Sequence, residues 1–423
     1  MRPAGSFLPY LRFPGRFHFR RVALVVLVAA GALAAGAGQA KPAAAKKAAE
    51  QREAPAATAQ AADDEGAILP VGFAGPLSGP SAGVGKSMLN AVRLALDEAN
   101  RRGVRIAGKN YRFKLLAQDD RADAATAEYV ARYLVSQHVV GVVGHWNSGA
   151  SLAAAPVYHA AGVAQISPAT MSRKFTAQAY PGVFRTIANN DAVGRFSAEY
   201  AVQKLGVKTL ATIDDRTPFG QGLAEQVART ARDLGIKVIG SYSVSDKTSD
   251  FNAPLIEMRK RNPDLIFFGG LDWQAGLLAK AIKRLKIDSR LMASAGTVGL
   301  PFLMQAGADG NGVLVLEPGS SLEKMPGWKS FRQRYGQNFD TDIDLYATFA
   351  YDAAQALVNA IGQAGSAEPS AIVQALHKLR FNGVSGAIAF NEEGDLLNPI
   401  LTMYEVREMR WVPVLQINGE AAR

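Results

Sequence analysis

Short apolar runs rich in β-branched residues alternate with amphipathic segments along most of the chain. Residues 139–143 form such a run, and an alanine-rich helix is expected from about Ser151 to Ala161. A second apolar run at 163–166 ends in a polar turn that begins with Ser167. Repeated alternation of strand and helix predicts a mostly parallel sheet with helices on both faces.

The alternation forms two successive series, which predict two similar α/β lobes rather than one very wide sheet. The first series has strands at 67–73, 111–117, 139–143 and 163–166, with helices at 86–100, 124–136 and 151–161. The second series has helices at 191–205 and 219–234, a third that ends near residue 261 and a fourth that begins at residue 272. Its strands are expected at 208–213, 237–242, 265–268, 290–293 and 310–317. Helices at 327–335, 343–362 and 371–379 then lead to a predicted terminal hairpin that pairs 387–390 with 400–404.

Polar residues follow two neighbouring strands of the first series. Trp146, Asn147 and Ser148 precede one helix, and Ala169 and Thr170 follow the next strand. Ligands of open α/β sheets bind outside the carboxyl ends of strands, where helix amides attract carboxylates. These turns therefore predict a small-molecule site. The alternative is that the polar side chains only cap helices.

The N-terminus has the pattern of a secretory signal peptide. Arg20 and Arg21 precede the uncharged run 22–38, and Gly38, Gln39 and Ala40 match a cleavage site, which predicts removal of residues 1–40 and a periplasmic location. A retained membrane anchor is the alternative. Residues 41–66 have few large apolar side chains and are expected to be a disordered linker.

The charge and cysteine content exclude several classes of protein. The net charge of +10 includes five arginines before residue 41, so the remainder carries 10 − 5 = +5. Its lysines and arginines are scattered, which argues against nucleic-acid binding. The absence of cysteine excludes disulfides, thiol catalysis and a lipid-modified N-terminal cysteine.

No recognised catalytic or cofactor motif is complete. The GVGKS segment that begins at Gly83 resembles the end of a phosphate loop, but Pro80 stands where the loop needs glycine. The first strand lacks a G-x-G-x-x-G motif, the five histidines lack metal-ligand spacing, and Ser148 is not in a G-x-S-x-G motif. We therefore expect a protein that is not an enzyme and has no cofactor or metal.

The order of several motifs resembles the leucine/isoleucine/valine-binding type of periplasmic substrate-binding protein, over about residues 67–415. The motifs are GPLSGPSAGVG, the DD pair at 119–120, GHWNSGAS, SPATMS, DDRTPFGQG, FFGG, FAYDAA and GAIAFNEEGD. The resemblance implies two Rossmann-like lobes, joined by three crossing segments, that close on a ligand. It places lobe one at 67–188 plus 318–386 and lobe two at 189–317 plus 387–423.

The resemblance also implies which residues bind the ligand. The ligand carboxylate would contact Ser148, Ala169 and the residue at position 171. The family usually has a threonine at this position, where this chain has Met171, so Thr170 or Ser172 is a candidate to supply the missing hydroxyl. Trp146 and Asn147 would line the same wall, and lobe two would contribute Phe219, Leu271 and Ala295. Tyr346, which lies in the part assigned to lobe one, matches a position of the family's side-chain pocket.

Ala295 is the main departure from the family pattern, because the family has an acid there that binds the ligand ammonium. Asp272 is a candidate replacement, although it equally fits a helix cap.

The sequence therefore predicts a monomeric, secreted binding protein that delivers a carboxylate-bearing solute to the membrane permease of an ABC importer. An amino acid is the leading ligand class, and an amide or an aromatic carboxylate is the alternative. A periplasmic sensor domain and a secreted enzyme are the other functions considered.

Overall fold

The computed structural model describes residues 66–418. The predicted signal peptide and almost all of the predicted linker lie outside these residues. Within them, no helix has the length and apolar character needed to cross a membrane.

The first sheet has six strands in the order β2 (Val104–Ile106), β3 (Lys109–Asp119), β1 (Ala67–Gly75), β4 (Val142–Gly144), β5 (Gln165–Ser167) and β6 (Val183–Arg185). All neighbours are parallel except the β2–β3 pair. The sheet is covered on both faces, because Val142 and Val143 are fully buried in two different apolar clusters. This confirms the expected buried parallel strand.

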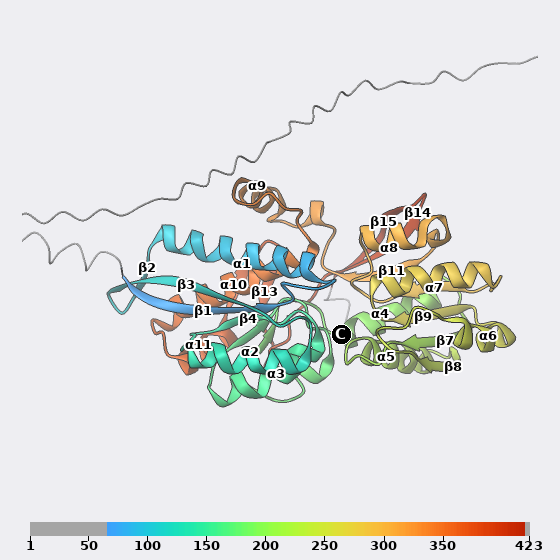
Figure 1. The fold of residues 1–423 in the computed structure, drawn as a ribbon, viewed down its shortest axis with the longest axis horizontal. Coiled ribbons are helices and arrows are strands. Elements are labelled where there is room, and N and C mark those ends of the chain that lie inside the picture. The colour runs from blue at the N-terminus through green and yellow to red at the C-terminus, as the bar shows by residue number, and fades with distance from the viewer. Residues whose placement is uncertain (1–65, 419–423) are drawn as a thin grey trace, which may run out of the picture. The chain divides into compact units, whose positions relative to one another are not determined.

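Helices form the layers on both faces of this sheet (Figure 1). The cluster on one face joins the strands to α1 (Ala82–Arg102), α10 (Leu345–Ala364) and α11 (Pro369–Lys378). The cluster on the other face joins them to α2 (Ala124–Ser136) and α3 (Ser148–Ala160). The predicted bounds of α2 are confirmed, whereas α1 begins four residues before the predicted Lys86.

The second sheet has seven strands in the order β15 (Arg410–Ile417), β14 (Leu401–Arg407), β11 (Leu314–Pro318), β10 (Arg290–Ala293), β9 (Leu265–Gly269), β7 (Thr209–Asp214) and β8 (Lys237–Ser243). The five strands from β11 to β8 are parallel, and β14 and β15 are antiparallel additions at one edge. One face packs against α4 (Asn190–Gln203) and α5 (Gly220–Asp233). The other packs against α6 (Asn252–Arg261), α7 (Asp272–Arg284) and α8 (Leu300–Ala306) (Figure 1). Two mostly parallel α/β series are thus confirmed.

The predicted terminal hairpin is wrong. Residues 387–389 form β13 (Ala387–Ala389), which pairs with β12 (Arg380–Asn382), and β14 instead pairs with β15. Ile388 and Phe390 are buried in the core of the first sheet. An apolar run on each side of an acidic glycine turn satisfies a hairpin pattern locally, but long-range packing of the first run decides the pairing.

The chain passes between the sheets three times: after β6, after β11 and before β14. The second and third segments are joined, because the amide of Gly319 donates to the carbonyl of Ile400 at 2.7 Å. Side chains from all three line a cavity of about 200 Å³. The α9 helix (Trp328–Asn338) follows the second segment. The lobe boundaries at 188, 317 and 386 stay predictions, although residues 387–390 pack with the first sheet.

Candidate functional site

The predicted site residues follow the carboxyl ends of parallel strands in both sheets. Trp146, Asn147 and Ser148 follow β4, and the turn that contains Ala169 and Thr170 follows β5. In the second sheet, Phe219, Leu271 and Ala295 follow β7, β9 and β10. This is the edge at which open α/β sheets bind ligands.

The first turn of α3 offers backbone amides at this edge. Asn147 occupies the N-cap position, but within residues 66–418 its side chain makes no capping hydrogen bond. Its Nδ2 instead donates to the carbonyl of Ala122 at 2.8 Å. The buried hydroxyl of Ser148 accepts from the amide of Ser172 at 3.3 Å and keeps its own proton for a further partner. A helix N-terminus with a hydroxyl donor is a suitable place for a carboxylate.

The turn after β5 is largely occupied by its own hydrogen bonds. The hydroxyl of Ser167 donates to the carbonyl of His145 at 2.9 Å and accepts from the amides of Ala169 and Thr170 at 3.3 and 2.9 Å. Ser167 therefore stabilises the turn rather than capping a helix, as the alternative interpretation had expected. The hydroxyl of Thr170 is buried and hydrogen-bonds to the hydroxyl of Ser151. This contact directs it away from the ligand carboxylate, which it was expected to bind in place of the family threonine at position 171.

Four of the predicted residues share one apolar cluster. Met171 and Ala295 are buried there, and the half-buried Phe219 and Tyr346 pack against them. Trp146 meets Tyr346 edge to face, with ring centroids 6.4 Å apart and an interplanar angle of 89°. The structure thus brings side chains from both α/β series to one place.

The α3 turn also approaches the second series directly. A Cβ added to Gly149 would lie 4.0 Å from Cδ of Pro218, which precedes Phe219. The Nδ2 of Asn190 donates to the carbonyl of Phe219 at 3.0 Å and fixes the backbone there.

Leu271 and Asp272 begin α7. Leu271 is the N-cap residue, and Oδ1 of Asp272 accepts from the amide of Trp273 at 2.8 Å. Burial raises the pKa of Asp272 above its ordinary value. Asp272 therefore acts at the helix start, while its partly exposed carboxylate still contributes negative charge to the site.

Sequence reasoning missed a buried acid beside Ala295. Glu317 of β11 is 2% exposed, and its Oε1 accepts from the amides of Gly296 and Val298 at 2.7 and 3.1 Å. Burial raises the pKa of Glu317 to about 7. A glutamate inside the apolar run LVLEP was a usable signal, because glutamate is almost never fully buried without a partner.

Asp344 is a second acid that the sequence analysis did not name. It is the N-cap residue of α10, and its Oδ1 accepts from the amide of Tyr346 at 2.9 Å. Burial, followed by the charge of Asp272, raises the pKa of Asp344.

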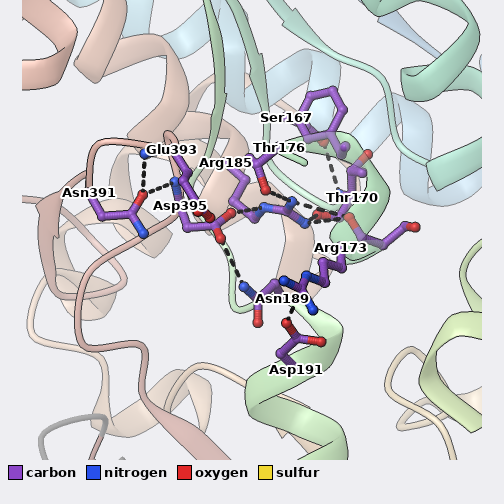
Figure 2. Close-up of polar contacts among 12 residues, drawn as sticks. Ser167, Thr170, Arg173, Thr176, Arg185, Asn189, Asp191, Asn391, Glu393 and Asp395 are labelled. Atoms are coloured by element: carbon purple, nitrogen blue, oxygen red, sulfur yellow. Dashed lines mark hydrogen bonds and ion pairs between the residues drawn. The ribbon is translucent and has the colours of Figure 1, made fainter. Parts of the chain in front are cut away.

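Arg185 holds the β5 turn in place, and the sequence analysis did not identify this residue. Its side chain is fully buried and donates to the carbonyls of Thr170 and Ser172 at 2.7 and 3.1 Å (Figure 2). Its Nε lies 2.6 Å from Oδ1 of Asp395, and Oδ2 of Asp395 accepts from Asn189 at 2.9 Å. The guanidinium thus ties the turn to the first and third crossing segments.

A second buried network supports the β4 turn. Nδ1 of His145 lies 2.7 Å from Oδ2 of Asp120, and its Nε2 lies 3.3 Å from the hydroxyl of Tyr158. Asp119 instead accepts from the amide of Leu77 at 2.8 Å, so the two adjacent aspartates do not form a carboxylate pair. Among residues 66–418, no group of three or more histidine, aspartate or glutamate side chains is arranged to hold a metal ion.

Comparison with known proteins agrees with this architecture. The chain matches the family model described as periplasmic binding protein over residues 69–408. Leu/Ile/Val-binding protein homolog 2 of Brucella abortus is 30% identical over 349 residues, which cover 81% of this chain and 91% of the relative. This degree of identity over nearly the whole relative goes well beyond a shared fold.

Two solved structures share the fold. LivJ of Streptococcus pneumoniae, a branched-chain amino acid transporter substrate-binding protein in complex with isoleucine, has a TM-score of 0.72 and 24% identity, covering 83% of this chain and 99% of LivJ. A solute-binding protein of an ABC transporter from Rhodopseudomonas palustris, in complex with 3,4-dihydroxybenzoic acid, has a TM-score of 0.72 and 21% identity, covering 83% and 98%. On the family match and the Brucella relative, the chain belongs to the periplasmic binding protein family, a family of binding proteins rather than enzymes.

Proposed function

We propose that this protein is the periplasmic solute-binding component of an ABC importer and binds a small carboxylate-bearing solute, with an amino acid as the leading class. The names of the Brucella relative and of LivJ support the amino acid assignment. The permease of such an importer is the proposed partner, and residues 1–40 are the proposed signal peptide.

The observation that carries the proposal is the start of α3. Its first-turn amides and the hydroxyl of Ser148 lie beside the half-buried rings of Trp146 and Tyr346. The amides and hydroxyl are suited to a carboxylate, and the aromatic rings are suited to an apolar side chain.

An aromatic carboxylate is the second candidate ligand. Two observations favour it: Ala295 stands where the resemblance implies an acid, and the Rhodopseudomonas protein of the same fold was solved with 3,4-dihydroxybenzoic acid. A planar ring could stack on Trp146.

Thermal unfolding against a ligand panel tests the proposed function. The panel contains amino acids, aliphatic and aromatic carboxylates, amides and small polyols. A ligand at about 100 times its dissociation constant stabilises the folded protein by roughly 2.7 kcal/mol, which gives a measurable rise in Tm. A panel in which no carboxylate raises Tm would contradict the proposal.

A variant tests the carboxylate position directly. Ser148→Ala removes the hydroxyl donor and is expected to weaken carboxylate binding by about 1–3 kcal/mol in calorimetry. Ser136→Ala is the matched control, because the hydroxyl of Ser136 is exposed and donates to the carbonyl of Tyr133 within α2. Equal affinities for wild type and Ser148→Ala would remove Ser148 from the site.

A further inference from the structure

We propose that Glu317 binds a protonated amine of the ligand, which makes the site selective for solutes that carry both a carboxylate and an ammonium group. The inference rests on the proposed function, since it concerns the same site. It assigns a binding role to a residue of β11 and decides between the two candidate ligand classes.

The first argument is an unused carboxylate oxygen. Oε1 of Glu317 accepts two backbone hydrogen bonds, whereas Oε2 is buried without a hydrogen-bond partner among the described residues. Leaving a buried charged oxygen unpaired is costly, so such an atom calls for a specific partner. An ammonium group donates three hydrogen bonds and carries the complementary charge.

The second argument is the position of this oxygen in the site. The loop that Glu317 holds begins directly after Ala295, at the carboxyl end of β10. A Cβ on Gly296 would lie 3.1 Å from the hydroxyl of Tyr346, so this ring reaches the same loop. The negative charge of Glu317 also contributes to the raised pKa of Tyr346. The acid absent at Ala295 is thus replaced from the neighbouring strand.

A second buried polar group lies on the loop that Glu317 holds. Oγ1 of Thr297, on the same loop, is buried without a partner in the part of the chain that the structure describes. The rings of Tyr346 and Trp146 meet edge to face, with centroids 6.4 Å apart. A ligand amine at Glu317 would therefore be adjacent to the aromatic wall of the carboxylate site.

The third argument is the uncompensated negative charge. The charges of Glu317, Asp344 and Asp272 all contribute to raising the pKa of Tyr346, and that of Asp344 also contributes to raising the pKa of Glu317. No ion pair within residues 66–418 includes any of these three acids. Such a field attracts an ammonium group and repels a ligand whose only charge is a carboxylate.

The experiment compares an amino acid with its deaminated analogue, for example leucine with 4-methylpentanoate, in calorimetry on the purified protein. Glu317→Gln keeps an oxygen for the amides of Gly296 and Val298 but removes the charge. We expect this variant to lose about tenfold or more in affinity for the amino acid, without weakening the binding of the analogue. Glu323→Gln, an exposed acid on the second crossing segment, is the matched control and should change neither affinity.

The outcomes separate the inference from the proposed function. Equal losses for both ligands would mean that Glu317 only holds the loop, and unchanged amino acid affinity would remove it from the site; either overturns the inference alone. A wild-type protein that binds only carboxylates without an amine also overturns it. Binding of no carboxylate at all overturns the proposed function and the inference together.

Proton release on binding gives a second test that needs no variant. Because the pKa of Glu317 is about 7, an ammonium group at this carboxylate should release about half a proton at pH 7. The other titratable groups that interact with it are Asp344, Tyr346 and, on β14, Tyr404, and Asp272 interacts in turn with Asp344 and Tyr346. Calorimetry in buffers of different ionisation enthalpy measures the release. An amino acid that releases no more protons than its deaminated analogue would contradict the assignment.

Discussion

The buried charge of Glu317 should cost the ligand-free protein stability. Burial raises the pKa of Glu317 from 4.5 to about 7. In the window between these values, the folded state binds more protons than the unfolded state. Stability therefore falls as pH rises through this window.

The magnitude follows from the shift. At roughly 1.4 kcal/mol per pH unit, the full penalty is about 3 kcal/mol above pH 8, and most of it develops between pH 5 and pH 8. Glu317→Gln lacks this titration. The variant should consequently gain about 2–3 kcal/mol over wild type when the pH changes from 5 to 8. The raised pKa values of Asp272 and Asp352 affect both proteins and cancel in the difference.

Urea denaturation of both ligand-free proteins at pH 5, 6, 7 and 8 measures the difference. Glu323→Gln serves as the reference, because it changes an exposed acid and should give a flat profile. A stability difference between Glu317→Gln and wild type that does not change with pH would refute the reasoning, since it would mean that Glu317 titrates like an exposed glutamate.

Three further predictions concern the scaffold and the neighbouring acid. Asp395→Ala leaves the buried guanidinium of Arg185 without its carboxylate and should lower the free energy of unfolding by about 3–5 kcal/mol in urea denaturation. A loss below about 1 kcal/mol would show that water replaces the carboxylate. Gly220→Ala places a methyl group against the carboxylate of Asp215 and the carbonyl of Gly269, the last residue of β9, and should cost about 1–3 kcal/mol. Gly336→Ala, with open space at the Cβ position inside α9, should be neutral or slightly stabilising, and similar Tm values for both variants would contradict this. Asp272→Asn keeps the oxygen that caps α7 and should weaken amino acid binding by less than about tenfold in calorimetry, so a larger loss would make Asp272 the main partner of the amine.

Local patterns in the sequence predicted most of the secondary structure. The strand around Val142 and the helix at 124–136 follow from apolar periodicity, which depends only on near neighbours. The start of α1 was placed too late because Gly83 and Gly85 were interpreted as loop residues. Gly85 is instead helical and lies against the backbone of Pro76, where a side chain has no room.

The parts of the site that depend on distant contacts were not predictable in the same way. The turns at Ser148 and Ala169 were identified because they directly follow apolar strands. Glu317 lies on a strand 22 positions after Ala295, and only the pairing of β10 with β11 brings its carboxylate to the loop there. Arg185 was likewise not identified, since its partner Asp395 is far along the chain.

The paired aspartates at the ends of β3 and β7 give both sheets the same exit turn. Asp119 accepts from the amide two residues later, as does Asp214, and Arg121 and Arg216 both have positive φ values of 55° and 62°. The second members differ: Asp120 contacts His145, whereas Asp215 keeps an oxygen without a partner among the described residues. The same carboxylate-braced turn thus leads out of a strand at the carboxyl edge of each sheet, where the predicted ligand turns also lie.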